Sequence, residues 1–167
     1  MLSTQIHDRW GMGTAYGRLG ILSLLKDDLP NAKTMLENSL TLFNDLGARW
    51  DIAWSLTNLG KVAIASEDWS EAERLLKHAI KLSLKAQAMP QAIDATLELA
   101  DCFAHQGKVN DAMELILPAL IHPASTDVAR QRAGELKSVV EPQISSNDHE
   151  NMADSKTLVD VLEHFLT

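Results

Sequence analysis

Residues 59–79 read LGKVAIASEDWSEAERLLKHA, and their pattern of large and small side chains recurs once before and once after this stretch at the same interval. The matching positions are Leu19-Gly20, Leu59-Gly60 and Leu99-Ala100, then Ala32, Ala72 and Ala112, then Leu36, Leu76 and Ile116, and lastly Ser39, Ala79 and Ala119. Self-similarity at a fixed period of about 40 residues is typical of proteins built from stacked structural repeats. The chain is therefore predicted to be a repeat array.

Apolar residues recur at helical spacing almost throughout the chain, and no segment alternates with the two-residue period of a strand. Short polar joints separate the periodic segments, so consecutive helices should pack as antiparallel hairpins. We expect an all-α solenoid of about seven or eight helices. The helices are predicted at 8–25, 29–45, 49–66, 69–87, 90–106 and 109–120, which gives repeats at 8–47, 48–87 and 88–125.

The C-terminal part departs from the hairpin pattern. An extra helix is predicted at 126–141, because Ala133, Leu136 and Val139 follow Ile93, Thr96 and Leu99 by one repeat period. The array would then span 1–141 and be followed by a polar linker at 142–154. Residues 155–167 carry an amphipathic stripe and should form a final helix. That helix must dock either on the last hairpin or on another surface.

The N-terminal end carries no capping unit before the first predicted helix, although repeat arrays normally have one. That helix also contains Gly11, Gly13, Gly17 and Gly20, each of which costs about 1 kcal/mol relative to alanine in a helix interior. It should therefore depend on packing. We expect this end either to pair with a second copy as a homodimer or to follow further domains of a longer protein.

The composition limits the classes of function. The 167 residues are 46% apolar with a formal net charge of −8, which disfavours nucleic-acid binding. A basic stripe at Arg74, Lys77, Lys81 and Lys85 is interpreted as a solvated helix face. No segment is long and apolar enough for a membrane, and no signal peptide is recognised, so a cytoplasmic location is expected. The lone Cys102 is expected to be buried and inert.

Candidate catalytic and metal-binding groups are sparse. The six histidines include no pair at the helical ligand spacing, so no metal or other cofactor is predicted. The densest polar cluster, Asp148-His149-Glu150, falls in the predicted linker, where nothing would hold a general base in place. The chain is therefore not expected to be an enzyme.

The pattern of a Leu-Gly pair in one helix and an early alanine in the next resembles the tetratricopeptide repeat. The 40-residue length, with starts such as Arg9-Trp10 and Arg49-Trp50, resembles the C-terminal sensor arrays of bacterial STAND signal-transduction ATPases, which include the maltotriose-responsive and other LuxR-type activators. This resemblance implies a right-handed superhelix and an upstream nucleotide-binding domain that receives the signal. No G-x-x-x-x-G-K-[ST] phosphate-binding motif is present in this chain. The repetition of Trp10 and Trp50 favours a structural role for both.

The resemblance also implies a concave groove lined by the first helix of each hairpin. Its positions correspond to Arg18 in repeat one, to Trp54, Asn58 and Lys61 in repeat two, and to Asp94, Glu98, Asp101 and His105 in repeat three. The expected ligand is a protein, a peptide or a small-molecule inducer, and the alternative to a sensor is a free-standing adaptor that binds a partner's peptide. The acids of repeat three replace the cations of the known carboxylate clamp and would repel a carboxylate.

Two of these residues have alternative roles. The Asn58 amide could bond the backbone of a bound peptide or only a neighbouring helix. Trp54 could stack on a ligand or fill the contact between the first helices of successive hairpins.

Overall fold

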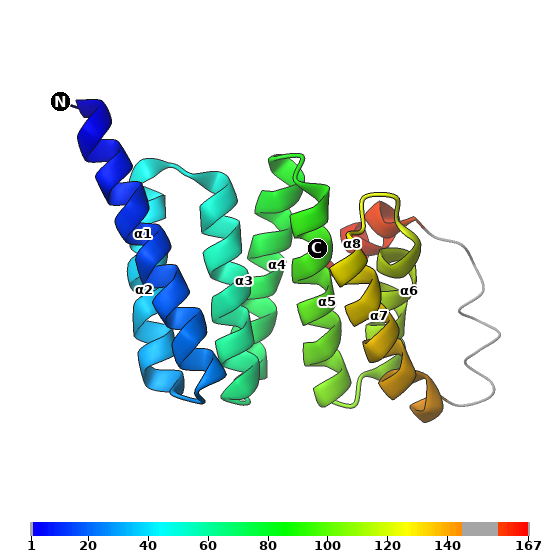
Figure 1. Ribbon diagram of the computed structural model, residues 1–167. Helices are drawn as coiled ribbons and strands as arrows, with labels where there is room; N and C mark the ends of the chain where they lie inside the picture. The colour runs from blue at the N-terminus through cyan, green and yellow to red at the C-terminus, as the bar shows by residue number, and fades with distance from the viewer. Residues whose placement is uncertain (1, 145–156, 167) are drawn as a thin grey trace.

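The computed structural model describes residues 2–144 and 157–166, with side chains from residue 8 onward. Within these ranges the regular structure is entirely helical, and consecutive helices pack as hairpins in chain order (Figure 1). The predicted all-α solenoid is confirmed. The helices are α1 (Leu2–Leu25), α2 (Leu29–Leu46), α3 (Arg49–Ala65), α4 (Trp69–Lys85), α5 (Met89–His105), α6 (Val109–Ile121), α7 (Asp127–Val140), the 3-10 helix η1 (Glu141–Gln143) and α8 (Leu158–Leu166).

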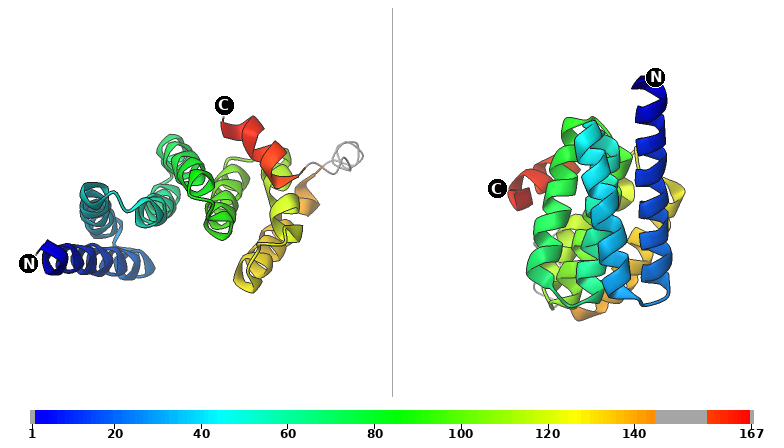
Figure 2. Two further views of the ribbon diagram at one scale, coloured as in Figure 1. Left: turned by 90° about the horizontal axis from the view of Figure 1, so that it is seen from above. Right: turned by 90° about the vertical axis from the view of Figure 1, so that its left-hand side faces the viewer.

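The helices form two layers. Seen from above, α1, α3, α5 and α7 lie along one side of the array, while α2, α4 and α6 lie along the other (Figure 2). Each first helix also packs on the next one, α3 on α5 and α5 on α7, so one face of the array consists of these helices alone. None of the helices described here has the length and apolar character needed to cross a membrane.

The five connections from α1 to α6 share one backbone geometry. Each contains a residue in the left-handed region, with φ between 55° and 74°. The N–H groups of this residue and of the next one donate to carbonyl oxygens of the preceding turn, which is the Schellman arrangement. The left-handed residues are Asp27, Gly47, Glu67, Gln87 and Gly107. They are evenly spaced at half the repeat period, so a helix and its turn form one unit and two such units form each repeat.

Aspartates begin two of the second helices. The Asp28 carboxylate accepts a hydrogen bond from the Asn31 N–H at 3.3 Å, and the Asp68 carboxylate accepts one from the Glu71 N–H at 3.2 Å. Each bond satisfies a backbone donor that the first turn of a helix leaves free. These caps start a new helix directly after the left-handed residue, which keeps the turn short.

Exchanges at the left-handed positions should change stability in opposite directions. Gln87→Gly should raise the free energy of unfolding by about 1 kcal/mol, because the left-handed conformation costs a residue with a Cβ about that much. Gly107→Ala should lower it by a similar amount. A Cβ at Gly107 would have no atom within 4 Å, so its effect isolates the backbone. Urea unfolding measures both, and equal values for the two variants would contradict the prediction.

The core follows the register of the repeat. The alanines that begin the second helices and the large residues one turn later are fully buried in all three repeats, and the small residues that follow are at most 1% exposed. The buried sets are Ala32, Ala72 and Ala112, then Leu36, Leu76 and Ile116, then Ser39, Ala79 and Ala119. The recurring pattern therefore marks the residues that join the two helices of each hairpin.

Three of the four glycines of α1 lie against large side chains of α2 or α3, whereas a Cβ on Gly11 would meet nothing within 4 Å. A Cβ on Gly13 would lie 2.9 Å from the Phe43 ring, and one on Gly17 would lie 2.5 Å from the ring of Trp54. The cost of these glycines in a helix is thus offset by close packing, as expected from the sequence. The helix itself begins at Leu2, well before the predicted start at residue 8, and its N-terminal part extends beyond α2 (Figure 1).

The two repeated tryptophans are not core residues. Trp10 is 47% exposed and Trp50 is 54% exposed. Trp10 Nε1 donates to the Asp51 carboxylate at 3.2 Å, which links α1 to the start of α3. The structural role expected for the pair is therefore limited to contacts at the surface.

One face of α1 is open to solvent. Leu19 and Leu22 are 50% and 48% exposed, whereas their counterparts Leu59 and Val62 are 5% and 3% exposed. The counterparts are buried because α3 packs on the preceding hairpin, and no helix among the described residues occupies the equivalent place beside α1.

The joint between α6 and α7 breaks the regular spacing of helices and turns. α6 contains Pro118 and has 13 residues where α4 has 17, and it is followed by an extended residue, His122. The shorter helix and extended joint change the placement of α7. The predicted register consequently fails in the second half of α7: Ala133 is fully buried, but Val139, matched to the buried Leu99, is 62% exposed.

The final helix docks on the array. α8 packs against α6 and α4 on the side opposite the first helices (Figure 2), and it buries Leu158, Val161 and Leu162. Phe165 adds a ring contact to Phe103 of α5, with centroids 5.6 Å apart. Residues 145–154 of the predicted linker, including Asp148-His149-Glu150, lie outside the described residues, as do 155–156 and 167 of the predicted final helix.

Candidate functional site

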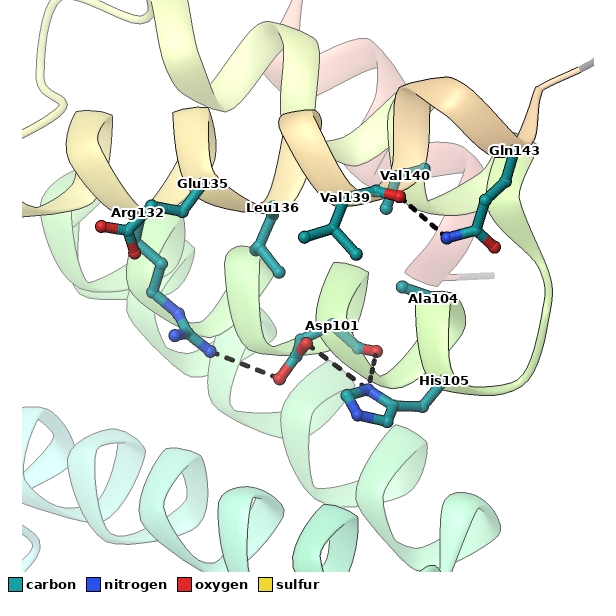
Figure 3. A pocket seen from close by; sticks show the side chains of 9 residues that line it. All are labelled: Asp101, Ala104, His105, Arg132, Glu135, Leu136, Val139, Val140 and Gln143. Carbon is teal, nitrogen blue, oxygen red and sulfur yellow. Dashed lines mark hydrogen bonds and ion pairs between the residues drawn. The ribbon is translucent and has the colours of Figure 1, made fainter.

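Three adjoining pockets lie on the face formed by α3, α5 and α7. The Trp54 pocket has a volume of about 220 Å³ and is lined by Trp54, Thr57, Asn58, Lys61, Gln91, Asp94, Leu97, Glu98, Val128, Ala129 and Arg132. The central pocket, of about 410 Å³, is lined by Lys61, Ile64, Ala65, Glu98, Asp101, His105 and Arg132. The Leu136 pocket, of about 390 Å³, is lined by Asp101, Ala104, His105, Arg132, Glu135, Leu136, Val139, Val140 and Gln143 (Figure 3).

Seven of the eight residues predicted for the groove line these pockets, because the first helices of repeats two and three lie side by side. Five of them, Trp54, Asn58, Lys61, Asp94 and Glu98, meet in the Trp54 pocket. Asp101 and His105 line the other two pockets. Arg18 lies exposed on α1 and contributes to none of the three.

The pockets share a row of ion pairs that crosses three helices. Glu98 of α5 is buried, and its two carboxylate oxygens pair with Lys61 Nζ of α3 at 3.2 Å and with Arg132 Nη2 of α7 at 3.0 Å. Arg132 Nη2 also lies 3.4 Å from the Asp101 carboxylate. Both cations are partly exposed, whereas the Glu98 side chain is 6% exposed. A buried anion is thus neutralised by two cations that extend from the pocket walls.

The row of charges ends at His105. Its Nδ1 lies 3.0 Å from the Asp101 carbonyl oxygen and 3.5 Å from the Asp101 carboxylate (Figure 3). The ring also stacks on Trp69 at the start of α4, with centroids 5.9 Å apart. Trp69 therefore contacts a pocket residue from the start of α4 and helps to position its ring.

Arg132 lines all three pockets, and the sequence-based assignment missed it. Extending the repeat register into α7 assigns other positions to the groove, and the shortened α6 makes that register wrong there. A signal was present in the charges. The acids Asp94, Glu98 and Asp101 of α5 precede a helix rich in cations, so a cation of α7 facing them could have been expected.

Trp54 takes the packing role foreseen as its alternative. Its ring lies against the backbone of Gly17, where a Cβ would be 2.5 Å away, so it joins α1 to α3. The rest of the half-buried ring forms a wall of the Trp54 pocket. Its replacement would disturb α1 as well as the groove.

Asn58 bonds its own helix rather than a neighbouring one. Its Nδ2 donates to the Trp54 carbonyl oxygen at 2.8 Å. Only the NH₂ group can donate to a carbonyl, so this bond fixes the orientation of the amide and leaves Oδ1 as the other atom. Asn58 is 6% exposed and lines the Trp54 pocket.

Asp94 lies at the edge of the Trp54 pocket. Burial of its carboxyl group raises its pKa above the usual value, Lys61 lowers it and Glu98 raises it further. Within residues 2–144 and 157–166, Asp94 makes no ion pair or hydrogen bond. The pocket therefore keeps a carboxyl group that forms no ion pair with the described residues, although the charge of Lys61 acts on it.

Cys102 and the basic stripe lie outside the three pockets. Cys102 is fully buried, and burial raises the pKa of its thiol, which makes the thiolate scarce. No group of three His, Cys, Asp or Glu side chains suited to a metal ion occurs in the described part of the chain. In the basic stripe, Arg74 and Lys77 pair with the acids Glu71 and Glu73.

Two family profiles match the chain, and both describe tetratricopeptide repeats. One matches residues 11–85 and the other matches residues 63–130. Together they cover the array from α1 to the start of α7, which includes the helices that form most of the three pockets. No curated protein gives a significant match to the sequence.

Proposed function

We propose, since the chain belongs to the tetratricopeptide repeat family, that it binds an extended segment of a partner protein along the face formed by α3, α5 and α7. Tetratricopeptide domains generally bind proteins or peptides and are typically not catalytic. The observation that carries the proposal is the row of three adjoining pockets on this face, joined by Arg132.

The size of the pockets favours a segment over a single small molecule. Sites for drug-sized ligands usually enclose about 300–1,000 Å³ and bury most of the ligand. Here the space is divided into parts of about 220, 410 and 390 Å³ that follow one another along the array. Successive side chains of an extended peptide would fit such a row, with one side chain in each pocket.

The charges argue against a carboxylate clamp. The two cations of the groove, Lys61 and Arg132, already pair with Glu98. A C-terminal carboxylate would have to compete with Glu98 for them, next to Asp94 and Asp101. The proposed segment therefore binds through its interior residues rather than through its C-terminus.

A role as the sensor array of a STAND ATPase, which the repeat length implies, stays a prediction. A sensor array of a STAND ATPase would relay binding to an upstream nucleotide-binding domain, and the family matches extend to tetratricopeptide repeats alone. Pairing of two copies through α1 is likewise a prediction. The exposed Leu19 and Leu22 are the residues on which it would depend.

The proposed function can be tested by selecting peptides that bind the whole chain from a display library of random peptides. Val128 lines the Trp54 pocket and is 77% exposed, so Val128→Trp should fill the pocket without disturbing the core. We expect Val128→Trp to lower the affinity for the selected peptides by about tenfold, or about 1.4 kcal/mol.

Ile121→Trp is the matched control, because Ile121 is 79% exposed at the end of α6 and lies outside the three pockets. Fluorescence polarisation with the selected peptides measures both affinities. Equal binding to the two variants, or a failure to select any peptide, would contradict the proposal.

A further inference from the structure

The polar side chains of the Trp54 pocket have their donors directed into the helices. The Asn58 amide and the Thr57 hydroxyl each donate to the carbonyl oxygen one turn earlier in α3. Gln91 Nε2 of α5 donates to the carbonyl oxygen of Trp50 at 2.9 Å. In each case the nitrogen or hydroxyl group bonds a helix backbone. The two amide oxygens accept no hydrogen bond within the described residues, and each amide nitrogen keeps a second N–H.

Two of these oxygens lack a partner in the described structure. Gln91 is 8% exposed, and its Oε1 is buried without a hydrogen bond. Asn58 is 6% exposed, and no hydrogen bond to its Oδ1 is found among the described residues. A buried acceptor without a donor is unfavourable. A ligand that brings an N–H group would satisfy Gln91 Oε1, and a second N–H would give Asn58 Oδ1 a donor.

The charged residues of the same pocket are two cations and two acids, and one acid is left without an ion pair among the described residues. Lys61 and Arg132 are engaged by Glu98, whereas Asp94 has no partner cation in the part of the chain that the structure describes. Asp94 and Gln91 are one turn apart on α5, so the carboxylate and the unpaired amide oxygen lie on the same face of the helix. Together with Asn58 across the pocket, they form a set of acceptors with which neither Lys61 nor Arg132 forms an ion pair or a hydrogen bond in the described structure.

The remaining walls are apolar. Trp54, Leu97, Val128 and Ala129 line the pocket beside the acceptors, and its volume of about 220 Å³ suits one long side chain. Lysine and arginine combine an aliphatic stem with a charged head that only donates hydrogen bonds. An aromatic ring such as Trp54 adds attraction for a cation.

We propose that the Trp54 pocket receives a lysine or arginine side chain of the bound segment, whose head pairs with Asp94 and donates to the oxygens of Asn58 and Gln91. This inference rests on the proposed function and specifies the segment as basic. Burial raises the pKa of Asp94, and a cation bound beside the carboxylate would lower it again.

The first experiment uses two small probes, Nα-acetyl-lysine methylamide and its neutral counterpart Nα-acetyl-norleucine methylamide, titrated into the whole chain and followed by NMR. The lysine derivative should shift the amide signals of Asn58, Gln91 and Asp94 and bind more tightly than the neutral one. Asp94→Asn should weaken the binding of the lysine derivative by about tenfold, because the variant removes the charge that pairs with the ammonium group.

Glu37→Gln is the matched control, because it removes the same charge from an exposed position on α2. It should leave the affinity unchanged. Equal binding of the two probes, or an equal effect of the two variants, would overturn the basic subsite.

The second experiment separates this inference from the proposed function. Peptides selected from the random library should carry a lysine or arginine at one common position, and Asp94→Asn should remove that preference. Peptides that lose affinity with Val128→Trp but contain no such residue would overturn the subsite and leave the proposed function standing. Peptides insensitive to Val128→Trp would overturn the proposed function itself.

Discussion

Replacing both Lys61 and Arg132 by methionine should lower the free energy of unfolding by about 3 kcal/mol, as expected when a buried anion loses its partners. The Glu98 side chain is 6% exposed, and its two oxygens pair with these two cations. Methionine keeps most of the aliphatic packing and removes the charge, so the loss reports on the stranded carboxylate. Urea unfolding at neutral pH measures it.

Replacing the anion instead of its two cations should lower the free energy of unfolding much less. Glu98→Gln leaves two cations whose side chains are 39% and 40% exposed, and these can turn toward water. We expect a loss of about 1 kcal/mol, close to that of a single hydrogen bond. Adding Glu98→Gln to the double variant should then restore most of its stability. A triple variant as unstable as the double one would show that Lys61 and Arg132 act through packing and not through charge.

Gly60→Ala should destabilise the array by about 2 kcal/mol, although alanine is the better helix former. A Cβ at Gly60 would lie 2.6 Å from both Cγ and Cδ2 of Leu76, and Leu76 is fully buried and has no space to move. Thermal or urea unfolding measures the change. Gly134→Ala in α7 is the matched control, because a Cβ there meets nothing within 4 Å, and it should stabilise by about 0.5–1 kcal/mol.

The third repeat suggests a compensating exchange. It carries Ala100 and Ile116 at the positions of Gly60 and Leu76, and both are fully buried. Gly60→Ala combined with Leu76→Ile should therefore recover most of the lost stability. If the double variant is no more stable than Gly60→Ala alone, the clash with Leu76 is not the cause of the loss.

Much of this fold follows from the sequence because small and large residues repeat at positions that must interlock. Ala72 and Leu76 are buried for the same geometric reason as Ala32 and Leu36, so one repeat predicts the next. The left-handed residues at the turns are harder to predict from the sequence. Gly47 signals a left-handed helix end, whereas Asp27, Glu67 and Gln87 adopt the same conformation without a glycine. Their conformation is imposed by the packing of the helices on either side.

The candidate site was predictable only where the repeat is regular. The groove residues of α3 and α5 share a pocket because both helices keep the register of the repeat. Arg132 could not be placed in this way, since Pro118 and the extended His122 shift α7 relative to α5. The bonding of Asn58 to its own helix was also beyond the pattern, because a side chain's partner depends on local geometry that spacing does not specify.

The docking of α8 bears on how the molecule unfolds. In a simple array each hairpin touches only its neighbours, and stability is a sum of local and nearest-neighbour contributions. α8 contacts both α4 and α6, and through Phe165 it also reaches α5. Opening any of these helices therefore breaks contacts shared with the others, which couples α4, α5, α6 and α8. The α1–α2 hairpin packs on α3 and not on α8, so we expect it to open before this group of helices.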